Sequence, residues 1–440
     1  MSSKDTATTG MHPASTHGGP LSSAPNELRA LSALAFDELS RFPGAIRDMH
    51  LGIAQRAFRG VGPAGRPVQL IHDAVSSRAY GAIGAGASGL GKAVDATVQQ
   101  RGVGARASLS TTPKGSFGIA VLNGLIGDRL EREGSALHQP TSARMHGQPI
   151  GLDEFSLRDA FPQATSRLAV FIHGLTGDEF CWSWGQNPAT NPGAEEAYGS
   201  RLASDLGYTP LYLRYNSGLH ISENGRTVAA LLQELVESWP VEVEQIALVG
   251  HSMGGLVARS AAHQADEHDH RWVRQVRHVV SLGTPHMGAP LERGAHWAAV
   301  TLDKLPETRM LSNFLKKRSA GIRDLRHGSL VDEDWRGRDP EALRAAACKE
   351  VPLLPGATHY FVSASVTRDP EHPLGSLLGD ILVLVPSARG KSKTRRIPFC
   401  DEHGHHIGGT HHLALLNHPE VYERMHSWLA TAPKTTASAA

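Results

Sequence analysis

The chain has 440 residues, enough for one large α/β domain and a substantial extension. Its 44 lysines and arginines nearly balance 43 aspartates and glutamates, so the net charge of +1 indicates no nucleic-acid partner. The 3 cysteines are odd in number and far apart, which excludes a disulfide framework and a paired-cysteine metal site. No apolar run reaches the ~18–20 residues of a membrane span and no signal-peptide pattern opens the chain, so the cytoplasm is the expected location.

The first part of the chain is predicted to be a tail followed by helices. Residues 1–27 are rich in Ser, Thr, Gly, Pro and Ala and are expected to be disordered. Residues 28–140 carry apolar side chains at helical spacing and predict a helical N-terminal extension, with one helix at 117–133. The small residues at 79–87 favour close packing against another helix, and peripheral contact of residues 28–140 with a membrane is the alternative.

From residue 143 the pattern changes to alternating apolar strands and amphipathic helices, which predicts an α/β domain over residues 143–430. Such alternation is typical of a mostly parallel sheet with helices on both faces. A long insertion at about 291–345 contains helical stretches and is expected to form a cap, and residues 431–440 are expected to be a disordered tail. The expected strands are 168–172, 209–214, 245–249, 277–282 and 358–364, and the expected helices are 195–206, 224–238, 254–265 and 413–429.

One pentapeptide, Gly250-His251-Ser252-Met253-Gly254, has the pattern Gly-x-Ser-x-Gly. An apolar run that favours a strand precedes it and a helix-forming stretch follows it, which is the context of a nucleophile elbow. The serine of an elbow sits in a very sharp turn, and glycines on both sides leave room for it. The sequence therefore predicts Ser252 as a nucleophile, with Gly250, His251 and Gly254 supporting the motif.

A serine hydroxyl needs a base to take its proton, and the base needs an orienting carboxylate. On sheets of this type, the acid and then the histidine follow the serine along the chain. His412 stands between a glycine-rich loop and the expected last helix and is the predicted base, with His411 as the competitor. Asp380, in a stretch typical of a loop that turns back to the sheet edge, is the predicted acid in preference to Asp369.

The histidines between residues 403 and 412 allow an alternative interpretation as a metal site. They lack the i, i+4 spacing of a helical zinc site, and no glutamate lies between paired histidines. We therefore expect neither a metal nor another cofactor.

A tetrahedral intermediate needs hydrogen-bond donors for its oxyanion. The backbone N–H of the residue after the nucleophile, Met253, is the first expected donor. The second should come from the loop after an early strand, which here reads His173-Gly174-Leu175. In that loop Gly174 lets the backbone approach the substrate, Leu175 supplies the N–H, and His173 completes the motif.

Three stretches together resemble α/β-hydrolase lipases and esterases. They are residues 170–175 with the His-Gly pair, residues 249–256 with the elbow, and residues 282–290 with Leu-Gly-Thr-Pro-His. The branch that they resemble most includes bacterial triacylglycerol lipases and GPI-inositol-deacylase-like hydrolases. The resemblance covers about residues 143–430, and its motifs are specific to the superfamily rather than to a substrate.

The resemblance implies an α/β-hydrolase fold and hydrolysis of small-molecule or lipid esters through an acyl-enzyme, with Ser252, Asp380 and His412 as catalytic residues. An acyltransferase or a thioesterase would use the same machinery on a different acceptor or ester. A non-catalytic scaffold that binds a membrane or a partner is the alternative from another class. It predicts a degenerate triad, whereas all three residue types are present here.

Overall fold

The computed structural model describes residues 108–185, 196–289, 318–339, 348–368, 379–380 and 382–431, together with Glu27 and Arg66. The expected tail at 1–27 and the expected helices between 28 and 100 lie almost wholly outside these residues. So do much of the insertion at 291–345 and the chain after residue 431. No helix in the described ranges is long and apolar enough to cross a membrane.

Eight strands form one sheet in the spatial order β2-β1-β4-β3-β5-β6-β7-β8. β3 to β8 are parallel, and the hairpin of β1 and β2 adds antiparallel to β4. Because the carboxyl ends of parallel strands meet at one edge, the loops after β3, β5, β6, β7 and β8 gather there. The bounds are β1 Ser142–Met145, β2 Gln148–Pro149, β3 Arg167–Ile172, β4 Thr209–Arg214, β5 Gln245–His251, β6 Val276–Leu282, β7 Thr358–Ser365 and β8 Gly404–Gly408.

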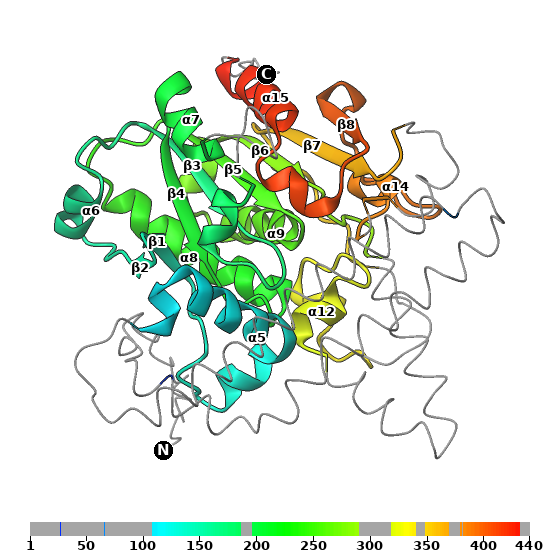
Figure 1. Cartoon of the computed structure of the whole chain (residues 1–440), viewed down its shortest axis with the longest axis horizontal. Coiled ribbons are helices and arrows are strands. Elements are labelled where there is room, and N and C mark those ends of the chain that lie inside the picture. Colours follow the sequence, from blue (N-terminus) through cyan, green and yellow to red (C-terminus); the bar gives the residue numbers. More distant parts are fainter. Residues whose placement is uncertain are drawn as a thin grey trace, which may run out of the picture.

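Helices cover both faces of this sheet (Figure 1). One layer contains α8, Ile221–Glu237, and α9, Met253–Glu267. The other contains α7, Tyr198–Leu206, and α15, Pro419–Ala430. The predicted fold class, a mostly parallel sheet with helices on both faces, is therefore confirmed.

The two layers bury alternate side chains of the same strands. In β3, Leu168, Val170 and Ile172 belong to the core under α8 and α9. Ala169 and Phe171 belong to the core under α7 and α15. Successive strand residues point to opposite faces, and both faces are apolar here because both are covered. This double burial explains why β3 appears in the sequence as a continuous apolar run.

Shorter elements flank the sheet. α5, Pro113–Arg132, is capped by Thr112, whose hydroxyl accepts a hydrogen bond from the N–H of Gly115, and Figure 1 shows the helix beside α12. The remaining helices are α6 Glu154–Ala160, α12 Ala320–Asp324 and α14 Val385–Ala388, and the 3-10 helices are η2 Leu109–Thr111, η3 Glu179–Ser183, η4 Arg271–Gln275, η6 Asp332–Asp334, η7 Asp401–His403 and η8 His412–Leu416.

The five expected strands correspond to β3 through β7, and four of the helices expected outside the insertion correspond to α5, α7, α8 and α9. The expected helix at 413–429 was wrong as one element, because residues 412–416 form η8 and α15 begins only at Pro419. Proline has no N–H and a fixed φ, so it starts a helix well but cannot continue one. The short strands β1, β2 and β8 were not predicted.

Candidate active site

Ser252 lies at the turn between β5 and α9, half-buried, with φ 55° and ψ −124°. Such a backbone conformation is rare for a residue with a side chain and costs about 1–3 kcal/mol. The flanking glycines permit the turn. A β-carbon on Gly250 would lie 2.5 Å from Cα of Gly255, and one on Gly254 would lie 2.1 Å from the carbonyl oxygen of Ile172. The turn therefore has the strained strand-to-helix geometry that is typical of a nucleophile elbow.

Asp380 and His412 meet in the loops after β7 and β8. His412 Nδ1 lies 2.7 Å from Oδ2 of Asp380, and both residues are buried, with Asp380 at 1% and His412 at 3% exposure. Oδ1 of Asp380 accepts hydrogen bonds from the N–H groups of Leu382 and Val383, at 3.1 and 2.8 Å. The backbone N–H of His412 also donates to the carbonyl oxygen of Asp380, at 3.1 Å. These contacts fix both the carboxylate and the imidazole.

The other ring nitrogen of His412, Nε2, is buried and has no hydrogen-bond partner among the described residues. Because a carboxylate only accepts, Nδ1 carries the proton in this contact, and in a neutral imidazole Nε2 is then the acceptor. His411 is exposed, and among the described residues it is the ring of His412 that forms the hydrogen bond to the acid. The alternative acid, Asp369, lies outside the described residues.

The serine turn and the imidazole of His412 both lie beside the end of β6, although Nε2 of His412 makes no hydrogen bond with Ser252. The N–H of Ser252 donates to the carbonyl oxygen of Leu282, the last residue of β6, at 2.8 Å. A β-carbon on the next residue, Gly283, would lie 3.1 Å from Cε1 and Nδ1 of His412. The three predicted catalytic residues thus come from loops that share one edge of the sheet.

His251, beside the serine, supports the position of His412. Its Nε2 donates to the carbonyl oxygen of His412 at 3.2 Å, and the two ring centroids lie 4.7 Å apart. Burial, and secondly the nearby His412, hold the pKa of His251 well below its ordinary value. A neutral His251 can donate through Nε2 without placing a positive charge beside the expected base.

The two expected oxyanion donors lie on either side of the elbow. Met253 is the first residue of α9, where a backbone N–H has no partner within the helix. In the loop after β3, a β-carbon on Gly174 would lie 3.0 Å from Cβ of Ser252, so the loop passes directly beside the serine. The carbonyl oxygen of Gly174 accepts from Nδ1 of His173 at 2.9 Å and from the N–H of Gly177 at 3.1 Å. Carbonyl and N–H of one trans peptide point in opposite directions, so these bonds orient the N–H of Leu175.

His173 is fully buried, and burial lowers its pKa to about 3, so it is neutral at neutral pH. Its ring stacks on Tyr215 with centroids 4.2 Å apart, and its Nε2 accepts from the N–H of Tyr215 at 3.3 Å. The hydroxyl of Tyr215 donates to the carbonyl oxygen of His173 at 2.7 Å. Tyr215 is therefore a supporting residue that the sequence analysis missed, because no local pattern links it to His173.

Two of the histidines considered as a metal site, His405 and His406, contact protein groups. His405 Nε2 lies 2.6 Å from Oε1 of Glu420, and His406 contacts the hydroxyls of Ser363 and Ser365 at 3.0 and 3.1 Å. Within the described part of the chain, no three His, Cys, Asp or Glu side chains form a group that could hold a metal ion.

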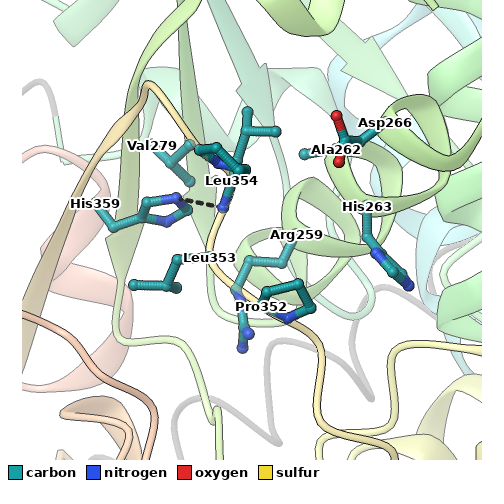
Figure 2. Close-up of a pocket in the computed structure, with 10 residues that line it drawn as sticks. Arg259, Ala262, His263, Asp266, Val279, Pro352, Leu353, Leu354 and His359 are labelled. Carbon is teal, nitrogen blue, oxygen red and sulfur yellow. Dashed lines mark hydrogen bonds between the residues drawn. The ribbon is translucent and has the colours of Figure 1, made fainter. Parts of the chain in front are cut away.

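A separate pocket lies between α9 and the segment that leads into β7 (Figure 2). It is lined by residues that include Arg259, His263 and His359, and the N–H of Leu354 donates to Nε2 of His359 at 3.1 Å. None of its lining residues belongs to the elbow, to the Asp380–His412 pair or to the oxyanion loop. We therefore do not assign the expected chemistry to this pocket.

Residues 218–337 match the family model described as a PGAP1-like alpha/beta domain. This segment contains the elbow, and the sheet around it has an antiparallel hairpin followed by parallel strands. The chain has an α/β-hydrolase fold. The resemblance expected from its three motifs is therefore confirmed. No curated protein sequence matches the chain.

Solved hydrolase structures resemble the chain only distantly. The mature lipase BlEst2 of Bacillus licheniformis is 17% identical and has a TM-score of 0.37, with 60% of this chain and 92% of the lipase covered. A hyperthermophilic esterase of Pyrobaculum calidifontis is 16% identical with a TM-score of 0.33, over 61% and 76%. A 2-hydroxy-6-oxo-6-phenylhexa-2,4-dienoate hydrolase of Rhodococcus is 14% identical with a TM-score of 0.31, over 62% and 92%. The fold assignment rests on the sheet order and the family match, not on these distant likenesses.

Proposed function

We propose that this protein is a serine hydrolase that cleaves carboxylic esters through an acyl-enzyme, with Ser252, Asp380 and His412 as its triad. The observation that carries the proposal is the 2.7 Å contact between His412 Nδ1 and Asp380 Oδ2, which leaves the buried Nε2 without a described partner. A buried nitrogen without a partner costs free energy, so it is expected where a function requires it. The PGAP1-like match over the elbow supports hydrolysis of esters as the reaction class.

In the proposed reaction, Nε2 of His412 takes the hydroxyl proton of Ser252 as Oγ attacks the ester carbonyl carbon. The carbonyl oxygen becomes an oxyanion that accepts hydrogen bonds from the N–H groups of Leu175 and Met253. Collapse of the intermediate breaks the bond to the alcohol, which leaves with the proton from Nε2. Water then attacks the acyl carbonyl carbon in the same way, with Nε2 again taking the proton. This step releases the carboxylic acid and restores the serine.

Hydrolysis of p-nitrophenyl esters from acetate to palmitate, by wild type and Ser252→Ala, tests this proposal. Wild type should hydrolyse at least one ester, and Ser252→Ala should lose about 10⁴-fold or more of kcat. Ser204→Ala, which changes an exposed serine of α7, is the matched control and should keep wild-type activity. Equal rates for Ser252→Ala and wild type would refute the serine mechanism.

The same assay separates the alternatives. Faster product formation with an added alcohol or thiol acceptor would indicate an acyltransferase, and preference for a thioester would indicate a thioesterase. Absence of turnover on every ester, together with no covalent labelling of Ser252 by a fluorophosphonate, would favour a scaffold. A cytoplasmic location and peripheral membrane contact through residues 28–140 stay predictions, and flotation with liposomes tests the second.

A further inference from the structure

Helix α5 lies directly against the segment that begins with the expected oxyanion donor Leu175. Phe117, in the first half of α5, packs edge-to-face on Trp184, with ring centroids 5.6 Å apart. Two turns further along the helix, a β-carbon on Gly124 would lie 2.5 Å from Cγ2 of Thr176. Residues i and i+7 share one face of a helix, so a single face of α5 follows this segment from Trp184 back to Thr176.

Thr176 is held in an unusual conformation at the point of contact. Its φ is 59°, which is rare for a β-branched residue, and its N–H donates to the hydroxyl of Ser217 at 3.1 Å. A β-carbon on Gly124 would also lie 3.0 Å from the backbone nitrogen of Thr176 and 3.1 Å from its Cα. The helix therefore touches the main chain immediately after Leu175, and a displacement here moves the peptide that carries the donor.

The helix is itself anchored to the other loops on this side of the site. The carbonyl oxygen of Gly124 accepts a hydrogen bond from the hydroxyl of Ser319 at 2.6 Å. The carbonyl oxygen of Gly127 accepts from Nδ2 of Asn216 in the loop after β4, at 2.9 Å. Within α5, Asn123 donates through Nδ2 to the carbonyl oxygen of Leu137 at 2.7 Å. These bonds fix α5 firmly enough for it to act as a support.

We propose that α5 positions the oxyanion loop and that Gly124 sets the distance between this helix and the peptide of Leu175. The inference rests on the proposed function, because it assigns a support to one of that reaction's hydrogen-bond donors. One face of a helix that precedes the whole sheet in the chain would then position a hydrogen-bond donor of the proposed reaction. Such support matters because a misplacement of about 1 Å at a reacting geometry can cost about 10²-fold in rate.

Gly124→Ala tests the proposal, since the added methyl group must displace Thr176. We expect kcat to fall about 10–100-fold with little change in KM, because oxyanion contacts form only in the transition state. The affinity for an aliphatic trifluoromethyl ketone, which forms a tetrahedral adduct on the serine, should fall by a similar factor. Arg132→Ala, at an exposed position on the same helix, is the control and should change neither quantity.

Adding Thr176→Ser to Gly124→Ala removes the Cγ2 atom that meets the new methyl group, and should recover part of the lost kcat. Amide hydrogen exchange of Thr176 supplies a measurement that does not depend on turnover. Exchange at this N–H should become faster in Gly124→Ala and stay unchanged in Arg132→Ala, because its bond to Ser217 is disturbed only in the first variant.

The possible outcomes separate the two proposals. Wild-type kcat and unchanged exchange at Thr176 in a folded Gly124→Ala would overturn the role of α5 and leave the proposed function intact. An inactive wild type would count against the proposed function, and the exchange measurement would still decide whether α5 positions this loop. If Arg132→Ala lost as much kcat and thermal stability as Gly124→Ala, this result would also overturn the specific role of Gly124.

Discussion

Asp380 orients His412 through a buried contact of 2.7 Å between Oδ2 and Nδ1, while its second oxygen accepts from two backbone N–H groups. Backbone N–H groups therefore hold one oxygen of the acid, and the other oxygen meets the imidazole. This arrangement places a proton on Nδ1, and in the proposed reaction Nε2 of the neutral imidazole would accept the proton of Ser252. Position and tautomer of the expected base both depend on one carboxylate.

Asp380→Asn should lower kcat by about 10³–10⁴-fold while the protein stays folded. An asparagine keeps the shape, but it can present an N–H to Nδ1 and so favour the wrong tautomer. Steady-state kinetics on the best p-nitrophenyl ester measure the loss. Asp401→Asn, at an exposed aspartate that pairs with Lys391, is the control and should keep activity. A fully active Asp380→Asn would remove Asp380 from the triad and make Asp369 the candidate acid.

The conformation of Ser252 predicts that, at this position, a glycine variant is more stable than an alanine variant, the reverse of the usual order. Ser252→Ala keeps a β-carbon at φ 55°, whereas Ser252→Gly relieves this strain. We expect the glycine variant to have the higher free energy of unfolding, by about 1 kcal/mol, measured in urea. At Ala262, within α9, alanine should be the more stabilising residue, so Ala262→Gly should lower the free energy of unfolding by about 1 kcal/mol. If Ser252→Gly is the less stable of the two, the turn is not strained in solution.

The sequence predicted β3 through β7 well because these strands are buried on both faces and contain long apolar runs. β1 and β8 are short, and β8 consists of Gly-His-His-Ile-Gly, which has no strand pattern to recognise. The turn at Ser252 could be predicted from local sequence, and the contact of Asp380 with His412 from the chain order that such sheets follow. The contacts of Tyr215 with His173 and of Gly124 with Thr176 could not, because they join residues whose proximity exists only after folding.

Buried histidines predict a loss of stability in mild acid. Burial lowers the pKa of His173 and His359 to about 3 and that of His278 to about 4. In the unfolded chain these groups bind protons near pH 6.5, so the unfolded state binds more protons as the pH falls below that value. The stabilisation is fully present above pH 6.5 and decreases toward pH 4 and below. When the pH falls from 7 to 5.5, each of the three histidines should lower the free energy of unfolding by about 1 kcal/mol. Urea unfolding at the two pH values measures this loss.

His278→Leu isolates one of these contributions. Neither ring nitrogen of His278 has a hydrogen-bond partner among the described residues, so an apolar side chain of similar size loses no bond there. The variant should lose stability less steeply than wild type between pH 7 and 5.5, by about 1 kcal/mol over the range. A pH dependence identical to that of wild type would show that His278 is protonated or solvated in the native state.

The ion pair of Arg214 and Glu179 is almost fully buried between β4 and η3, and this burial leads to the last prediction. Their side chains are 0% and 6% exposed, and Nε of Arg214 lies 2.6 Å from Oε2 of Glu179, with Nη2 bonded to the second carboxylate oxygen. Nη1 donates to the carbonyl oxygen of Ser110, at 2.7 Å, just before α5. Glu179→Gln would leave the guanidinium buried without its counter-charge.

Breaking a buried pair from one side commonly costs about 3–5 kcal/mol, so we expect a loss of that size in the free energy of unfolding of Glu179→Gln. Arg158→Ala, which removes the exposed pair with Glu154 on α6, should change stability by no more than about 0.5–1 kcal/mol. Urea unfolding of both variants beside wild type measures the contrast. Equal small losses in the two would mean that water reaches Arg214 in solution, because only a solvated guanidinium tolerates the loss of its carboxylate.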